Sequence, residues 1–183
     1  MKTLILALGN PILSDDGVAH EVADRLAKRL KSLSTTTNPA LSEKKTCPER
    51  SPRVEGRQYD IIKSSAATMD IIPKLAGYHR LVVVDAVQLG SAPFGTVHRF
   101  SLTDLASTVH PSSPHDINFA TAFQMARQWG YHIPEDIRIY GIEVKELSRF
   151  SQSCTPEITE KLHEIVEHII SDLVGSRESK AGN

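Results

Sequence analysis

Two carboxylates and an imidazole stand where an α/β sheet would bring them together. Asp16 and Asp85 each follow a segment that reads as a buried strand, and His115 lies in a loop before a helix. In an open α/β sheet the carboxyl ends of the strands share one edge, where ligands bind. Two carboxylates and one imidazole suit a borderline divalent metal, with coordination positions left open for substrate. These residues therefore predict metal-linked chemistry.

Each of the three residues also has an ordinary structural explanation. Adjacent acids such as Asp15 and Asp16 are favoured at a helix start, because a carboxylate caps the first N–H groups and meets the positive end of the helix dipole. Asp85 has the alternative role of a turn acid that hydrogen-bonds its own loop, and His115 that of a helix-start residue. Spacing alone leaves both explanations open.

Other common chemistries have little support in the sequence. The GxGxxG pattern is absent, and the second expected strand ends Ile61-Ile62-Lys63-Ser64 without the acid that would hold a ribose. No Ser lies in a GxSxG motif, and neither Cys47 nor Cys154 has a CxxC partner or a helix-start context. Dinucleotide binding and nucleophilic catalysis are therefore disfavoured, and the two cysteines are expected to be free thiols in a reducing cytoplasm.

Hydrophobic patterning predicts the elements that would position these residues. Buried strands are expected at 4–8, 59–62, 81–84 and 137–144, and helices at 14–30, 69–76, 115–130 and 155–175. The stretch 90–100, with turn residues between apolar runs, predicts an antiparallel excursion such as a hairpin. Strands that alternate with helices indicate one α/β domain with a mostly parallel, twisted sheet and helices on both faces.

Length and composition set the domain boundaries. With 183 residues, 40% of them hydrophobic, the chain suits one domain, expected at 1–175. Residues 31–56 are rich in Ser, Thr, Pro, Lys and Glu, which predicts a mobile surface insertion, and 176–183 are expected to form a disordered tail.

Charge and hydropathy exclude several classes of partner. With 21 basic and 22 acidic residues the net charge is −1, so neither nucleic acid nor an anionic membrane is an expected partner. No apolar run approaches membrane-spanning length. The amino terminus has one Lys before a short apolar run and then an acidic turn, which favours a first strand over a signal peptide.

Three motifs together resemble the signature regions of the [NiFe]-hydrogenase maturation endopeptidases. They are Leu-Gly-Asn-Pro-Ile-Leu-Ser-Asp-Asp-Gly-Val at 8–18, Val-Val-Val-Asp-Ala at 82–86 and Ser-Pro-His-Asp at 113–116. The apolar segment Ile-Tyr-Gly-Ile-Glu-Val at 139–144 is similar too, so the resemblance extends from residue 1 to about 174. It implies that Asp16, Asp85 and His115 are the catalytic, metal-binding residues.

The resemblance implies a cytoplasmic protease that removes a carboxyl-terminal extension from a hydrogenase large-subunit precursor. The nickel would be supplied by that precursor as the recognition signal, so the enzyme would need no metal of its own. Two alternatives remain: a non-catalytic chaperone that binds the nickel-loaded precursor, and an unrelated metal-dependent hydrolase of small amides. Cleavage and chaperone-type binding would use the same ligands, so the sequence does not separate them.

The chain departs from the family pattern in three places. Ala19-His20 replaces a usual second glycine, Ser64-Ser65-Ala66-Ala67-Thr68 replaces a usual Asp-Gly-Gly-Thr, and the insertion at 31–56 has no usual counterpart. These differences predict an unusual substrate-facing surface or an atypical target hydrogenase.

Overall fold

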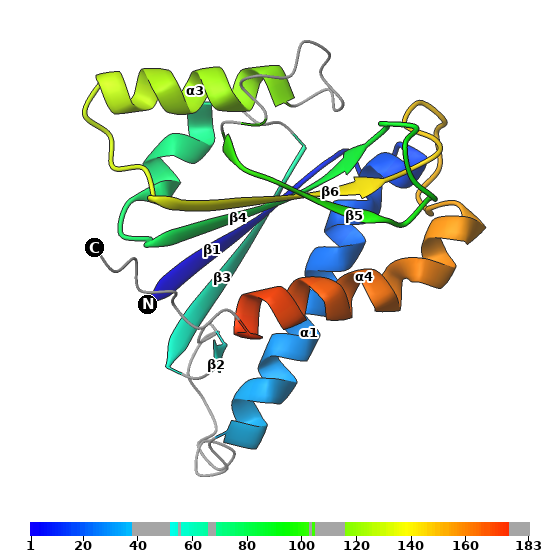
Figure 1. Ribbon diagram of the computed structural model, residues 1–183, viewed down its shortest axis with the longest axis horizontal. Helices are drawn as coiled ribbons and strands as arrows, with labels where there is room; N and C mark the ends of the chain where they lie inside the picture. The colour runs from blue at the N-terminus through cyan, green and yellow to red at the C-terminus, as the bar shows by residue number, and fades with distance from the viewer. Residues whose placement is uncertain (38–51, 55, 66–68, 103, 105–115, 176–183) are drawn as a thin grey trace.

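The computed structural model describes residues 1–37, 52–54, 56–65, 69–102, 104 and 116–175, which form a six-stranded sheet between two layers of helices (Figure 1). The strand order is β2-β3-β1-β4-β6-β5. Four strands are parallel: β1 (Lys2–Leu8), β3 (Arg57–Ser64), β4 (Arg80–Val87) and β6 (Asp136–Glu143). The edge strands β2 (Arg53–Val54) and β5 (Val97–Phe100) are antiparallel to their neighbours. The predicted single α/β domain with a mostly parallel sheet is confirmed.

Helices cover both faces of the sheet. Helices α1 (Val18–Thr37) and α4 (Pro156–Gly175) lie on one face, and α3 (Asp116–Gln128) lies on the other with the 3-10 helix η3 (Met69–Leu75) (Figure 1). Alternate residues of one strand enter the two cores: Ile5 packs with the α1 and α4 side, and Leu6 with the η3 and α3 side. This explains why the central strands read as continuous apolar runs.

Two predicted elements differ in detail. The antiparallel excursion is present, but β5 pairs with β6, so it does not form the expected hairpin within 90–100. The segment predicted as a helix at 69–76 is a 3-10 helix with Pro73 inside it. A proline lacks the N–H needed for an α-helical bond and clashes with the preceding turn, which favours the tighter, shorter helix.

Both ends of the predicted insertion at 31–56 have regular structure. Helix α1 continues to Thr37, and Arg53 and Val54 pair with β3. Residues 38–51 lie outside the described part of the chain, as do the predicted tail at 176–183 and His115. The mobility of the insertion and the disorder of the tail stay predictions. Among the helices that the structure describes, none combines the length and apolar character needed to cross a membrane.

Candidate active site

The connections of the sheet define one crevice at its carboxyl edge. From β1 the chain passes through α1 to β3 on one side, whereas β4 leads to β6 on the other side. Strands β1 and β4 are parallel neighbours, and Ala7 pairs with Val84. The chain leaves these two strands toward opposite edges of the sheet. Such a switch point is the usual ligand site of an open α/β sheet. Asp16 follows β1, and Asp85 lies near the end of β4.

The loop after β1 folds back on itself and fixes Asp16. The N–H of Asn10 donates to Asp16 Oδ2 at 2.6 Å, and the N–H of Asp16 donates to the carbonyl of Leu13 at 2.9 Å. Gly9 has φ +137°, a conformation that side chains rarely adopt. The loop ends in the 3-10 helix η1 (Ser14–Gly17), which contacts β4. The carboxylate of Asp16 is thereby held at the carboxyl edge of β1.

Asp16 has one carboxylate oxygen without a partner. The residue is 4% exposed, and its Oδ1 is buried with no hydrogen bond from any described residue. Leaving an ionised oxygen buried and unpaired is costly, so such groups are commonly paired with a cation or coordinate a metal. The donor chemistry at Asp16 therefore fits a hard or borderline cation.

Asp85 is also buried, with 3% of its surface exposed. Its Oδ1 accepts a hydrogen bond of 2.9 Å from the N–H of Ala86, as the turn-acid explanation expects. It is not a turn residue, however, because β4 continues beyond the predicted end at residue 84 to Val87. Asp85 thus sits within a central strand and shares the α3 face of the sheet with Val83.

His115 lies outside the described residues, although it directly precedes Asp116, the first residue of α3. The structure therefore describes two of the three predicted ligands, Asp16 in η1 after β1 and Asp85 within β4. Within the described ranges no group of three or more His, Cys, Asp or Glu side chains is arranged to hold a metal ion.

Asp15 connects two distant loops and does not cap its own helix. Its Oδ1 accepts the N–H of Thr155 at 2.6 Å, and its Oδ2 accepts the Thr155 hydroxyl at 3.1 Å and the N–H of Glu146 at 3.2 Å. The side chain is fully buried. Because Thr155 precedes the first turn of α4, the carboxylate lies at that helix's positive end. The expectation that Asp15 caps α1 is wrong.

Glu143 is a buried carboxylate that the sequence patterns above did not single out. It is 1% exposed, and its Oε1 accepts the N–H groups of Leu89 and Gly90 at 2.9 and 2.8 Å. Its Oε2 lies 3.0 Å from His98 Nε2, which can donate to it. Glu143 therefore holds the loop after β4 against the end of β6. An acid that ends an apolar strand was the signal for Asp85, and the same signal applied to 137–144 would have found Glu143.

His20, at one of the departures from the family pattern, is half-buried one turn after Asp16. Its Nε2 lies 3.4 Å from the carbonyl of Ser64, which also accepts the N–H of Gly9 at 3.1 Å. Burial lowers the pKa of His20, and the Ser64 carbonyl opposes that shift. A neutral imidazole is thus favoured where α1 meets the end of β3.

Cys154 stands two residues before α4, so the expectation that neither cysteine has a helix-start context is wrong for this residue. Burial, together with the negative charges of Asp15 and Glu21, raises the pKa of the Cys154 thiol to about 11. A nucleophilic cysteine requires the thiolate, which this environment disfavours. Cys47 lies outside the described residues.

Known proteins resemble the chain in sequence and in fold. The model of the family HycI, hydrogenase maturation protease, matches residues 43–172, a range that contains Asp85 and the Ser-Pro-His-Asp motif but not the motif at 8–18. No curated protein sequence matches the chain.

Similar solved structures include two HybD proteins and one HycI protein. The hydrogenase maturating endopeptidase HybD from E. coli has a TM-score of 0.66 at 19% identity, over 94% of this chain and 92% of that one. The [NiFe] hydrogenase maturation protease HybD from Thermococcus kodakarensis has a TM-score of 0.65 at 20% identity, over 95% and 99%. For HycI from Thermococcus kodakarensis KOD1 the TM-score is 0.56 at 19% identity, over 96% and 93%.

At these identities the solved structures establish the fold, whereas the family model matches more than half of the chain. The chain belongs to the hydrogenase maturation protease family.

Proposed function

We propose that the chain is an endopeptidase that removes the carboxyl-terminal extension of a nickel-loaded [NiFe]-hydrogenase large-subunit precursor. Family membership supports the protease activity and the link to hydrogenase maturation. The unpartnered Oδ1 of Asp16, buried at the switch point of the sheet, is the observation that carries the metal-linked part of the proposal.

Asp16, Asp85 and His115 would bind the nickel that the precursor brings. A divalent ion with open positions can polarise the scissile carbonyl or activate a water molecule. The protein's contribution is to fix the ligands. The N–H of Asn10 donates to Oδ2 of Asp16 and leaves Oδ1 available for the ion, and the N–H of Ala86 restrains the carboxylate of Asp85.

Asp15 has a supporting role in this proposal. Three donors from Glu146 and Thr155 already occupy its two oxygens, so it is poorly placed to accept a proton from substrate. The two adjacent acids thus have different roles: Asp16 would bind the metal, and Asp15 holds the loop that precedes α4.

The direct test is to incubate the purified protein with a nickel-loaded large-subunit precursor and to measure the precursor's intact mass. Shortening at one carboxyl-terminal position is expected from the wild type and not from Asp16→Asn. Tight binding without shortening by the wild type would instead identify a non-catalytic chaperone.

A further inference from the structure

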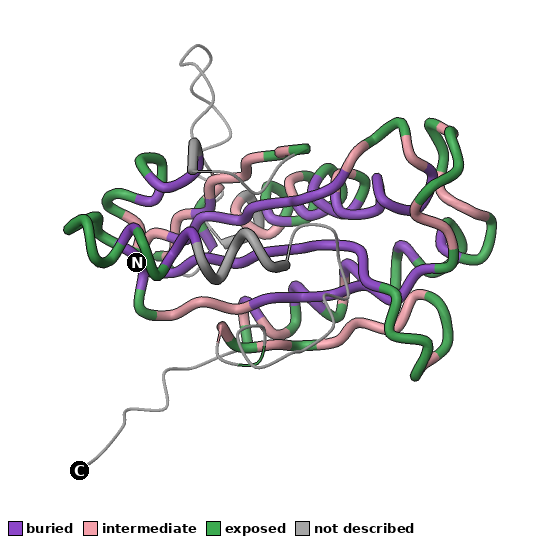
Figure 2. Tube along the Cα trace, turned by 90° about the horizontal axis from the view of Figure 1, so that it is seen from above, coloured by how far each residue is buried: buried purple, intermediate pink, exposed green. Residues whose placement is uncertain are grey.

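Large apolar side chains are exposed on three loops at the carboxyl edge of the sheet. They are Ile12 at 47%, Leu89 at 36%, Phe94 at 40% and Phe150 at 80% exposed, and we call them the apolar rim. Figure 2 shows exposed loops beyond the buried strands at the end of the sheet away from the N-terminus, and further exposed segments beside the N-terminus. Exposed apolar surface that gathers in one place commonly marks a site of interaction, and these four side chains lie on neighbouring loops.

Hydrogen bonds join the rim loops to one another and to the loop that holds Asp16. The N–H of Ser151 donates to the carbonyl of Ile12 at 3.0 Å, and the N–H of Ser14 donates to the carbonyl of Ser151 at 2.9 Å. The side-chain amide of Gln88 donates to the carbonyl of Lys145 at 2.7 Å. The rim is therefore continuous with the candidate active site.

The loop that carries Phe150 is fixed by its own polar groups. Glu146 Oε1 accepts the N–H and the hydroxyl of Ser148 and the N–H of Arg149. The two bonds from Ser148 contribute most to holding the pKa of Glu146 below its usual range. Asp15 anchors both ends of the loop through Glu146 and Thr155. An ordered loop that presents an aromatic side chain to solvent loses little backbone entropy on binding.

We propose that the apolar rim is the docking surface for the hydrogenase large-subunit precursor and that Phe150 is its anchor. This inference rests on the proposed function, because the rim adjoins the edge where the precursor's scissile bond would lie. Phe150 would enter an apolar pocket on the precursor, in the manner of the few buried aromatic residues that dominate most protein interfaces.

The size of the rim favours a precursor over a second copy of this chain. If each of the four side chains has about 200 Å² of surface, their exposed fractions give the rim on the order of 400 Å² of exposed apolar area. A stable interface between folded proteins buries about 800 Å² per partner. The rim alone is too small for a stable dimer, whereas a precursor would also be held through its nickel.

The experiment compares Phe150→Ala with Trp129→Ala, using nickel-loaded precursor. Trp129 is a matched control because it is 59% exposed and lies between α3 and the start of β6, at the amino edge of the sheet. We expect Phe150→Ala to raise both the KM for cleavage and the Kd for the precursor at least tenfold, with kcat within twofold. Trp129→Ala should match the wild type, and both variants should unfold at the wild-type temperature.

The outcomes separate this inference from the proposed function. Cleavage by the wild type with an unchanged KM for Phe150→Ala overturns the docking surface alone. A wild-type dimer in sedimentation that Phe150→Ala dissociates also overturns it and assigns the rim to a contact between copies. Binding without cleavage that depends on Phe150 supports the rim and overturns the protease activity. If the wild type neither binds nor cleaves the precursor, both the docking surface and the proposed function are overturned.

Discussion

The backbone carbonyl oxygen of Asp16 lies 1.9 Å from the position that a Cβ atom on Gly9 would occupy. No side chain fits there, and the φ of +137° at Gly9 is itself unfavourable for other residues. The closeness of these two backbones is what returns the chain from β1 to the edge of the sheet and places the Asp16 carboxylate.

Gly9→Ala should therefore displace the loop. We expect a loss of about 3 kcal/mol or more in the free energy of unfolding, because strain at φ and a backbone clash act together. Cleavage of the precursor should fall with it. Gly77→Ala is the control, since Gly77 has φ +82° but a Cβ atom there would meet no other atom within 4 Å, so only about 1 kcal/mol is expected. Equal losses measured by urea denaturation for the two variants would show that the close approach does not matter.

The adjacent acids Asp15 and Asp16 should have opposite phenotypes. Asp15→Ala leaves three donors without their acceptor and should cost about 2–4 kcal/mol, which lowers the melting temperature by roughly 4–16 °C. Asp16→Ala loses only the bond from Asn10 and removes an unpartnered oxygen, so stability should change by less than about 1.5 kcal/mol while cleavage is abolished. Thermal unfolding and precursor cleavage, measured on both variants, check this division. An active Asp16→Ala would refute it.

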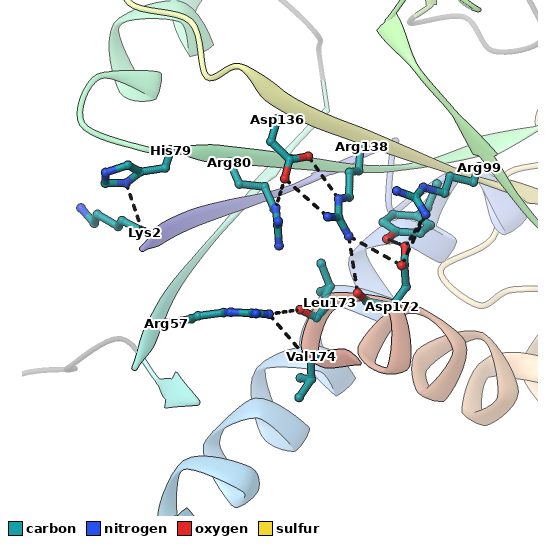
Figure 3. A network of polar contacts seen from close by, with 11 residues as sticks. Lys2, Arg57, His79, Arg80, Arg99, Asp136, Arg138, Asp172, Leu173 and Val174 are labelled. Atoms are coloured by element: carbon teal, nitrogen blue, oxygen red, sulfur yellow. Dashed lines mark hydrogen bonds and ion pairs between the residues drawn. The ribbon is translucent and has the colours of Figure 1, made fainter. Parts of the chain in front are cut away.

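A network of charged residues at the amino edge should affect stability without affecting activity (Figure 3). Arg80 is 4% exposed, and its Nε donates to Asp136 at 2.5 Å, while Arg138 Nε donates to the other oxygen at 3.1 Å. Asp136→Asn removes the partner of a buried arginine and should cost about 2 kcal/mol, a figure reduced because Asp136 is partly exposed. Arg80→Met should cost less than about 1 kcal/mol, since Asp136 keeps Arg138 and Arg80 Nη1 has no partner among the described residues.

The same ion pairs give stability a defined pH dependence. Burial opposes ionisation of Asp136, but the bonds from Arg138 and Arg80 outweigh it and lower the pKa of this carboxyl below its ordinary 3.8. The folded state therefore binds a proton on Asp136 less tightly than the unfolded state does. The stabilisation from the ion pairs of Asp136 is present above about pH 4 and is lost as pH falls further. Urea denaturation at pH 5 and at pH 3 should show a larger loss for the wild type than for Asp136→Asn, and equal losses would contradict the assignment.

Cys154 should react slowly with alkylating reagents. With the pKa raised to about 11, its thiolate is on the order of 100-fold scarcer near neutral pH than that of an ordinary cysteine. In a Cys47→Ser background, iodoacetamide labelling followed by mass spectrometry should be slower than that of a small-molecule thiol by about this factor. Adding Asp15→Ala should speed the labelling, because it removes one of the negative charges that raise the pKa of the Cys154 thiol. Rapid labelling of the Cys47→Ser variant itself would show that Cys154 is not shielded.

The central strands could be predicted from sequence because β1 and β4 are buried on both faces, which leaves continuous apolar runs at 4–8 and 81–84. The partner of β5 could not, because strand pairing depends on which edge is vacant in three dimensions, and β5 pairs with a strand that follows it by a whole helix. The helix at 69–76 was expected from its apolar residues, but Pro73 imposed the 3-10 form.

The candidate site was predictable only in part. Asp16 and Asp85 follow apolar runs, a local signal, and the structure places both at the carboxyl edge. Spacing alone did not separate Asp15 from Asp16, and only the family resemblance selected Asp16, because the partners of Asp15 lie 131 and 140 residues away in sequence. Glu143 carries the same local signal as Asp85, an acid at the end of an apolar strand, but its role in holding the loop after β4 could not be predicted, because its partners lie 53 and 54 residues before it.

The central claim is that the precursor supplies the nickel, and one measurement tests it most directly. Protein purified without added metal should be analysed for metal content and then given nickel-loaded and nickel-free precursor in parallel. We predict well under one equivalent of metal per chain, cleavage of the nickel-loaded precursor and none of the nickel-free precursor. Stoichiometric, chelator-resistant zinc together with cleavage of the nickel-free precursor would contradict the account.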